Sequence, residues 1–98
     1  MMDPSDDLFQ LLGNATRRRM LDLLAEHGSL SVTELAAEFP NLVKSGISKH
    51  LMALRAAEFV ISTREGRSQI YRINPQPFAD ALIPWLARYE AYWRSDGH

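Results

Sequence analysis

The sequence predicts a mainly α-helical domain with one small β-hairpin, an α+β arrangement in the order helix, helix, helix, helix, hairpin, helix. Three observations support this prediction. Apolar residues recur at helical spacing, two β-rich runs flank a glycine, and a pair of prolines precedes the last helical stretch. Residues 1–98 are expected to form one domain that folds without disulfide or metal support.

Two helices are predicted in the first part of the chain. Residues 5–12 begin with a serine cap and two acids, which complement the helix dipole, and continue with apolar residues. Gly13 interrupts this helix, and Asn14 is a suitable cap for a second helix that ends near His27 and a following glycine. The exposed face of the second helix carries three arginines at positions 17–19.

The next two predicted helices are separated by a short turn. Ser31 begins the third helix with a capping box, because a glutamate three residues later can return a hydrogen bond to the cap. A proline and an asparagine, residues 40–41, end that helix. A fourth helix begins near Val43 or Lys44 and continues to about Ala57.

The two faces of the fourth helix differ in character. Ile47, Leu51 and Leu54 recur at i, i+4 and i+7 and are expected to pack on the preceding helices. The opposite face is small, polar and basic, and it has no acid before residue 58. Such a face is suited to the major groove of DNA, where serine and lysine reach base edges or phosphates.

The β-hairpin is predicted from residues 60–64 and 68–73, which flank a short turn that contains a glycine. Because side chains alternate along a strand, Arg64, Arg67 and Arg72 are not all expected to point in one direction. Arg67, beside the glycine, is the best candidate for a contact at the tip of the hairpin.

The last helix is predicted over residues 78–94, after residues 74–77 break the strand. It has a strongly aromatic side. Pro84 lies inside this stretch, and it predicts either a kink or a restart of the helix with Pro84 in the first turn.

Positive charge is concentrated in one part of the chain. Between Lys44 and Arg72, six basic residues stand against two acidic ones, in a chain whose formal net charge is -1. The charged side chains of the first seven residues, by contrast, are all acidic. One face of the protein is therefore expected to attract phosphate while the rest is neutral or acidic.

The predicted order of elements is that of a winged helix-turn-helix domain. Three segments resemble the ArsR-type bacterial regulators: residues 13–20 in the second helix, residues 46–54 in the fourth helix, and residues 64–67 in the hairpin. With the terminal helix, the resemblance covers residues 8–94. The ending, residues 85–93, is similar to the metal-independent autorepressors of that family rather than to its metal sensors.

The resemblance implies a homodimer built on the first and last helices, about residues 5–12 and 78–94. Such a dimer binds an inverted repeat in double-stranded DNA, with two recognition helices in successive major grooves and the wings at flanking backbone or minor groove. This sequence departs from the family pattern in a turn one residue longer and in Val43, where a capping serine is customary. The departure leaves open which of Lys44 and Ser45 touches DNA.

The residues expected to contact DNA lie on the fourth helix, in the hairpin and at the start of the second helix. They are Arg17, Lys44, Ser45, Ser48, Lys49, His50, Arg55, Arg64 and Arg67. His50 has two interpretations, a contact with phosphate at the edge of the groove or packing against the neighbouring helix. The arginines at 17–19 also have two, because one or two of them could clamp phosphate, whereas charges on a helix face are more often only solvated.

The aromatic residues of the terminal helix are expected to form a dimer interface, because tryptophan and tyrosine supply a large buried area. The residues predicted for this interface are Leu8, Phe9, Leu12, Trp85, Tyr89, Tyr92 and Trp93. A small-molecule pocket at the terminal helices is the alternative, and its effector is not identified by any motif.

The composition excludes several other kinds of chemistry. The chain contains no cysteine, so disulfides, thiolate metal sites and thiol redox chemistry are excluded. Asp80 and Glu90 lie ten residues apart with no histidine between them, which is not the spacing of a zinc or nickel site, and His98 ends the tail. The three histidines have no serine or carboxylate partner at helical spacing, and no glycine-rich phosphate loop is present. We therefore predict no metal, no cofactor and no enzymatic activity.

The cellular location is predicted from the charges of the first residues and from the length of the apolar runs. The first seven residues carry acids where a signal peptide carries bases, and no apolar run reaches the roughly 20 residues that cross a bilayer. We expect a cytoplasmic protein without a membrane association.

The sequence thus predicts a dimeric, sequence-specific repressor of transcription, whose binding to double-stranded DNA weakens steeply with salt. Two alternatives are a winged-helix module that docks a protein through its aromatic end, and a ligand-responsive regulator with a pocket between the terminal and core helices. An electrophoretic mobility shift distinguishes the first alternative, and thermal stabilisation by a small molecule would identify the second.

Overall fold

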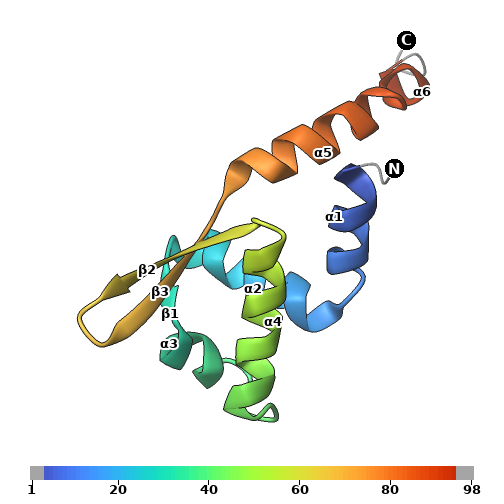
Figure 1. Cartoon of the computed structure of the whole chain (residues 1–98). Helices are drawn as coiled ribbons and strands as arrows, with labels where there is room; N and C mark the ends of the chain where they lie inside the picture. Colours follow the sequence, from blue (N-terminus) through green and yellow to red (C-terminus); the bar gives the residue numbers. More distant parts are fainter. Residues whose placement is uncertain (1–3, 95–98) are drawn as a thin grey trace.

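The computed structural model describes residues 4–94, and its elements follow the predicted order with one added strand and with the terminal helix divided into two (Figure 1). The helices are α1 (Pro4–Leu12), α2 (Ala15–His27), α3 (Val32–Ala37), α4 (Lys44–Ala56), α5 (Pro75–Ala87) and α6 (Glu90–Arg94); the strands are β1 (Leu30–Ser31), β2 (Val60–Glu65) and β3 (Ser68–Ile73). The mainly helical α+β prediction is confirmed. Within this range, every helix is too short or too polar to span a membrane.

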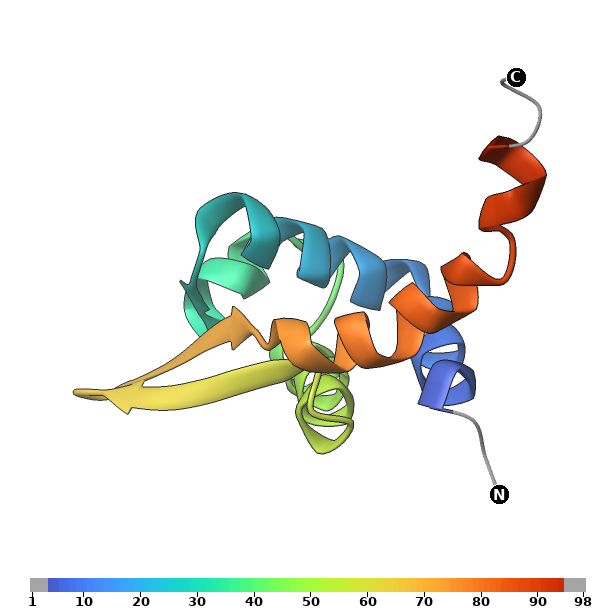
Figure 2. The same cartoon turned by 90° about the horizontal axis from the view of Figure 1, so that it is seen from above.

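The molecule is elongated, with extents of 53 × 30 × 23 Å. The hairpin of β2 and β3 projects from one end, and α6 lies at the opposite end (Figures 1 and 2). Helices α2, α3 and α4 form the body between them, and α1 packs beside α5. This arrangement separates the basic part of the chain from its aromatic terminus.

Two of the three predicted helix caps are present, at Asn14 and Ser31, whereas Ser5 lies inside α1, which begins at Pro4. The Asn14 side chain accepts a hydrogen bond from the backbone N–H of Arg17 at 3.0 Å, and Gly28 closes α2 with a φ of 83°. The Ser31 capping box is complete, because the Glu34 carboxylate accepts from the Ser31 N–H at 2.8 Å and the Ser31 hydroxyl accepts from the Glu34 N–H at 3.0 Å. These caps fix the limits of α2 and α3.

Helix α4 is anchored in the hydrophobic core by one of its faces. Ile47, Leu51 and Leu54 are completely buried, which confirms the predicted stripe. They belong to one cluster with buried side chains of the other elements: Leu8, Met20, Leu21, Leu23, Leu24, Leu30, Leu35, Phe59, Val60, Tyr71 and Ala81. Burying one such leucine contributes about 1.5–3 kcal/mol relative to exposure. The opposite face of α4 is left outside this cluster.

The sheet contains a strand that the sequence did not reveal. Its order is β1-β3-β2, and β1 pairs only Leu30 with Tyr71 and Ser31 with Ile70. A strand of two residues has no detectable period, and Ser31 carries the stronger signal of a helix cap. The short strand ties the helix-turn-helix directly to the hairpin.

The hairpin has a two-residue loop of Gly66 and Arg67, because Glu65 pairs with Ser68. Gly66 has a φ of 64°, and Arg67 is not among the residues with positive φ. A positive φ at only the first loop position is typical of a type II′ turn, whose twist matches that of the strands. The glycine is therefore required by the turn.

The end of α4 is closed by a Schellman motif with an unusual residue. The Phe59 N–H donates to the Leu54 carbonyl, and the Glu58 N–H donates to the Arg55 carbonyl, both at 2.9 Å. The motif places Glu58 in the left-handed region, at a φ of 66°, where glycine is the usual residue.

The prediction for the terminal helix was wrong in its start and in the restart at Pro84, whereas the alternative of a kink at Pro84 stays a prediction. The helix begins at Pro75 rather than at residue 78, because a proline lacks only an N–H that has no partner in the first turn. Pro84 neither breaks nor restarts α5, and the interruption comes at Arg88 and Tyr89, between α5 and α6. Pro84 has no N–H to donate to the Asp80 carbonyl four residues earlier. Both residues are exposed, so this part of the helix faces water.

Candidate nucleic-acid interface

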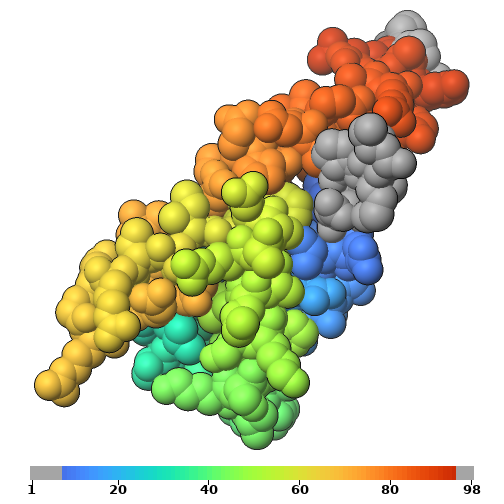
Figure 3. Space-filling view, in the orientation of Figure 1, coloured from blue at the N-terminus to red at the C-terminus, as the bar shows by residue number. Residues whose placement is uncertain are grey.

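The outer face of α4 is open to solvent, and atoms of this helix, green to yellow-green, lie at the centre of the space-filling view in Figure 3. Lys44, Ser45, Lys49 and Arg55 are exposed, and Ser48 is half-buried. No acidic residue lies in the first turn of the helix. Because the opposite stripe is anchored in the core, this face presents hydroxyl and ammonium groups on a rigid support.

The first turn of α4 is suited to an anion. Val43 occupies the N-cap position in an extended conformation, and its side chain makes no capping hydrogen bond. The first N–H groups of a helix and the positive end of its dipole attract a phosphate oxygen when no side chain caps them. Because α4 begins at Lys44, both Lys44 and Ser45 lie in this first turn.

Gly46 is not required by the interior of the protein. A Cβ atom at this position would meet only the Val43 Cγ2 atom, at the ordinary contact distance of 3.9 Å. A requirement for glycine here would therefore come from a molecule that approaches the outer face of α4, and not from the fold.

The hairpin register assigns its arginines to different faces. Arg64 pairs with Gln69 and shares the sheet face of Val60 and Tyr71, which packs on the helices. Arg72 lies on the other face, where its guanidinium is 3.6 Å from the Glu65 carboxylate. The expected divergence of these arginines is confirmed.

The arginine at the tip is separate from this ion pair. Arg67 is exposed in the two-residue loop, and the Arg64 Nε donates to the Gly66 carbonyl at 3.4 Å. The tip therefore presents one arginine outward and holds a second close behind it.

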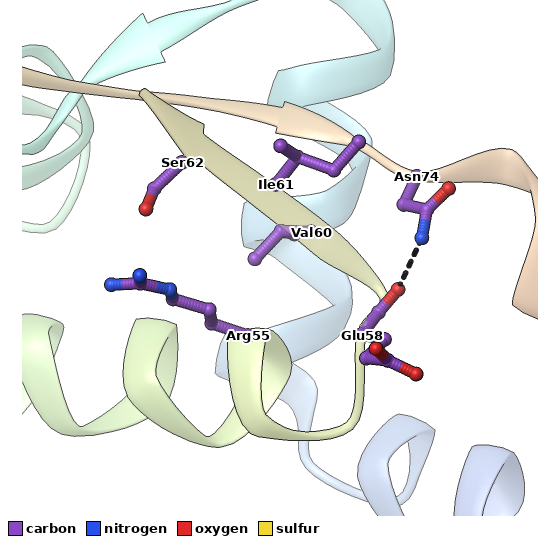
Figure 4. Close-up of a pocket in the computed structure, with 6 residues that line it drawn as sticks. All are labelled: Arg55, Glu58, Val60, Ile61, Ser62 and Asn74. Atoms are coloured by element: carbon purple, nitrogen blue, oxygen red, sulfur yellow. Dashed lines mark hydrogen bonds between the residues drawn. The ribbon is translucent and has the colours of Figure 1, made fainter. Parts of the chain in front are cut away.

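A hollow of about 250 Å³ joins α4 to the hairpin (Figure 4). It is lined by Arg55, Glu58, Val60, Ile61, Ser62 and Asn74. Figure 4 shows the Arg55 side chain extended beneath β2, with its guanidinium on the side of the Ser62 hydroxyl. The Asn74 amide donates to the Glu58 carbonyl at 2.9 Å and ties the end of α4 to the end of β3. The outer surfaces of α4 and β2 thus meet at Arg55.

Arg17 and Arg18 have structural partners that the sequence did not indicate. The Arg17 Nε donates to the Leu11 carbonyl at 3.0 Å, and the Arg18 guanidinium donates to the Leu12 carbonyl. These carbonyls lie in the last turn of α1, where the backbone leaves acceptors unpaired. The Asn14 turn brings the two helices together and makes these contacts possible.

His50 lies on α4 near the start of α2, and its side chain is half-buried. Burial lowers the pKa of the imidazole, and the positive charge of Arg17 lowers it further. The imidazole is therefore neutral over a wider range of pH than an exposed one. This environment favours packing for His50 in the absence of DNA.

Known proteins resemble this chain over most of its length. Residues 12–63 match the helix-turn-helix domain family. The HTH-type transcriptional regulator YuzN of Bacillus subtilis is 33% identical over 83% of this chain and 94% of its own length. The arsenic resistance transcriptional regulator ArsR1 of Pseudomonas putida is 33% identical over 90% of this chain and 70% of its own length.

Solved structures agree with the sequence matches. A crystal structure of an ArsR family transcriptional regulator has a TM-score of 0.79 and 30% identity, and the match covers 94% of this chain and 92% of that one. The chain belongs to the ArsR family of winged helix-turn-helix transcriptional regulators. This family consists of DNA-binding regulators and not of enzymes.

A second solved structure is a homodimer. It is the winged helix-turn-helix DNA-binding domain of a possible ArsR-family regulator from Mycobacterium bovis, with a TM-score of 0.68 and 30% identity over 89% of this chain and 81% of that one. In this ArsR-family chain, α4 and the β2–β3 hairpin correspond to the recognition helix and the wing of such a domain.

The aromatic residues of this ArsR-family regulator stack along α1, α5 and α6. Phe9 meets Trp85 edge to face with ring centroids 4.9 Å apart, and Trp85 lies 5.1 Å from Tyr89. Tyr89 in turn lies 6.4 Å from Tyr92. Much of the aromatic surface predicted for a dimer is thus in contact within one chain.

One predicted interface residue is wrong and two apolar residues were missed. Leu8 is completely buried in the core of the single chain, so it has no surface to offer a partner. Ile83 and Leu86 are 62% and 39% exposed, on the side of α5 that turns away from buried Ala81. Their spacing of three residues places both on one side of a helix, which is the signal of a second apolar face.

The remaining predicted interface residues differ in exposure. Leu12 and Trp85 are half-buried, whereas Phe9, Tyr89, Tyr92 and Trp93 are exposed. The apolar surface that remains open for a partner therefore includes Phe9 of α1 and the exposed side chains from Ile83 to Trp93.

In the part of the chain that the structure describes, no cluster of three or more histidine, cysteine, aspartate or glutamate side chains could hold a metal ion. The two carboxylates that the sequence singled out have other partners. Asp80 accepts from the Gln76 amide at 2.7 Å, and Glu90 pairs with the Arg94 guanidinium at 2.9 Å. His98 lies outside the described residues.

Proposed function

We propose that this ArsR-family regulator is a repressor that binds an inverted repeat in double-stranded DNA as a homodimer. The single observation that supports this proposal best is the outer face of α4, which is basic, exposed and free of acids in its first turn. In the proposed complex, Ser45, Ser48 and Lys49 enter the major groove, and Arg67 reaches the flanking backbone or minor groove.

Five further residues have roles in this complex. Lys44 contacts phosphate from the first turn of α4, and Arg55 and Arg64 contact the backbone between the groove and the wing. Met52, 66% exposed on the same face as Lys49, can contact a thymine methyl group. Arg17 stabilises the α1–α2 junction and adds its charge beside His50, at the edge of this surface.

The proposed dimer uses the exposed apolar residues of α5 and α6, together with Phe9 of α1. A homodimeric relative from Mycobacterium bovis with the same fold supports this arrangement. A stable interface buries roughly 1,200–2,000 Å² in total, and its centre is apolar and aromatic. Ile83, Leu86 and Trp93 line one hollow, and together with exposed Tyr92 they supply side chains of this kind.

The proposed repressor does not respond to thiophilic metals. Relatives of this chain include arsenic resistance regulators, but this chain has no cysteine to act as a thiolate ligand. We therefore place it with the metal-independent autorepressors, acting in the cytoplasm on its own promoter.

A selection of bound fragments from random DNA tests this function. We expect the recovered sites to contain a palindrome, because a two-fold dimer presents two equal recognition helices. Lys49→Ala is expected to weaken binding to the selected site and to change its base preference, by about 1–3 kcal/mol for a good base contact. Arg72→Ala is the matched control, because Arg72 lies on the other face of the hairpin and pairs with Glu65.

Three results would contradict the proposal. Recovery of sites without symmetry would exclude the two-fold complex. An unchanged affinity and preference in Lys49→Ala would show that α4 does not enter the groove. If no DNA is selected at all, the alternative of a protein-docking winged helix replaces this function.

A further inference from the structure

A second hollow lies away from the proposed DNA surface, between α2 and the joint that connects β3 to α5. Its volume is about 270 Å³, and it is lined by Leu21, Asp22, Ala25, Ile73, Pro75 and Phe78. None of these residues belongs to the outer face of α4 or to the tip of the hairpin. Helix α5 packs chiefly on α1, and the first turn of α5 forms one wall of the hollow.

The walls and the rim of this hollow differ in chemistry. Five of the six lining residues are apolar, and Asp22 is the single charged one. Among the residues that the structure describes, no side-chain hydrogen bond or ion pair engages the Asp22 carboxylate. The hollow therefore combines apolar contact area with one unpaired negative charge.

We propose that this hollow binds a small organic cation, in which an ammonium group is joined to an apolar ring or short chain. The ammonium group lies at Asp22, and the apolar part packs against Ile73, Pro75 and Phe78. Pockets for drug-sized ligands occupy about 300–1,000 Å³, so a hollow of about 270 Å³ suits a smaller molecule. Charge complementarity disfavours a carboxylate ligand, because Asp22 is the one charged residue that lines the hollow.

The position of the hollow gives such a ligand a means to affect DNA binding. Ile73 is the last residue of the wing strand β3, and Pro75 is the first residue of α5. A ligand held between this joint and α2 changes the orientation of α5, and therefore the spacing of the two recognition helices in a dimer. This role as an effector site rests on the proposed function, whereas the binding of the cation does not.

Titration of the full chain with three ring compounds of similar size tests the site. The probes are benzylamine, benzyl alcohol and benzoate, and the readout is the movement of backbone amide resonances in ¹⁵N-labelled protein. We expect benzylamine to shift the amides of Asp22, Ala25 and Phe78 in a saturable manner and to bind more tightly than the alcohol. Benzoate is expected to leave them unchanged.

Two variants test whether the Asp22 carboxylate and the hollow are needed for benzylamine binding. Asp22→Asn keeps the size of the side chain and is expected to weaken benzylamine binding roughly two- to fivefold, as one exposed ion pair would. Glu38→Gln is the matched control, because Glu38 is an exposed acid outside the hollow. Ala25→Leu fills the hollow and is expected to abolish binding of both benzylamine and benzyl alcohol.

Several outcomes would overturn the proposal. Equal affinity for benzylamine and benzyl alcohol, or an unaltered affinity for benzylamine in Asp22→Asn, would show that the site does not select a cation. Absence of saturable amide shifts with all three probes would show that the hollow does not bind ligands of this kind. If Ala25→Leu instead changes the oligomeric state and no probe binds, the hollow is occupied by a second copy of the chain.

The effector role has a separate measurement. The affinity for the selected DNA site is compared with and without benzylamine, in the natural chain and in Asp22→Asn. A change confined to the natural chain supports the role, and an unchanged affinity despite saturable binding overturns it. Failure to bind any DNA without benzylamine would instead disprove the proposed function and leave the titration valid.

Discussion

The two ends of this molecule expose opposite kinds of surface. At one end, α4 and the hairpin present lysine, serine and arginine, which are stable in water without any partner. At the other end, α5 and α6 expose Ile83, Tyr92 and Trp93 at 62%, 73% and 54%. Ile83 and Trp93 line one hollow, and apolar surface of this kind is typical of an interaction site.

The two ends differ in whether a single chain accounts for the exposed side chains. The charged end is complete in a single chain, because its orientation is set by the buried stripe of α4 and by the hairpin register. The apolar end leaves large side chains open to solvent in the single chain, and the proposed dimer would cover them. The following variants test this contrast, beginning with the largest expected effect.

Removing the anchor of α4 should destabilise the fold strongly. Leu51→Ala empties a completely buried position and is expected to lower the free energy of unfolding by about 2–5 kcal/mol. Met52→Ala, at the next position on the exposed face, is expected to change it by less than about 0.5 kcal/mol. Chemical denaturation of both variants measures the difference, and equal losses would show that α4 is not held by one face.

A charge in the apolar face of α5 should dissociate the proposed dimer. Ile83→Glu is expected to weaken association by about 2 kcal/mol or more, or roughly 30-fold in the dissociation constant, because the carboxylate would be desolvated in the interface. Sedimentation equilibrium measures this change, and the exposed loop substitution Ser29→Glu is the control for added charge. An unaltered dissociation constant would place the interface elsewhere.

The features that the sequence could predict are local patterns. The buried stripe of α4, the caps Asn14 and Ser31 and the glycine turn at the hairpin are local patterns, and each is confirmed. Local patterns are readable because their cause lies within a few neighbouring residues.

The features that were missed depend on contacts between distant segments. Arg17 and Arg18 looked like solvated or phosphate-binding residues, since nothing in their own helix shows that the α1 carbonyls lie beside them. Leu8 was assigned to a dimer although it belongs to the core, because one apolar stretch can pack inside or outside the chain. The two-residue strand β1 exists only through its pairing with β3.

The ion pair in the hairpin predicts a difference between two arginines. Arg67→Ala should reduce the slope of log affinity against log salt by about 1, because one phosphate contact is lost, and it should weaken binding evenly across DNA sequences. Arg72→Ala should leave the slope unchanged, because its guanidinium lies beside Glu65 on the other face. Fluorescence anisotropy over a salt series tests both, and equal slopes in the two variants would contradict the assignment of the tip.

The strained end of α4 predicts a stabilising substitution. Glu58→Gly should raise the free energy of unfolding by about 0.5–1 kcal/mol, because glycine adopts the positive φ of this position without a Cβ clash. Removing a carboxylate from the negative end of the helix dipole acts in the same direction. Thermal unfolding measures the change, and Glu38→Gly, at an αR position, should be destabilising instead.

The smallest effect concerns His50, where the structure gives a direction with pH. Burial and Arg17 hold its pKa below the ordinary value of 6.5. The unfolded chain therefore takes up a proton before the folded chain does, so this residue's contribution to stability is complete above pH 6.5 and is lost as the pH falls through the lowered pKa.

We expect the natural chain to lose stability over this range, and His50→Gln to lose less, when both are unfolded by denaturant at a series of pH values. The same pair of proteins distinguishes the two roles of His50. A phosphate contact favours the protonated imidazole, so it would raise the DNA affinity of the natural chain, but not of His50→Gln, as the pH falls. Packing alone predicts parallel pH profiles of DNA affinity in the two proteins, and because the side chain is half-buried beside Arg17, parallel profiles are the expected result.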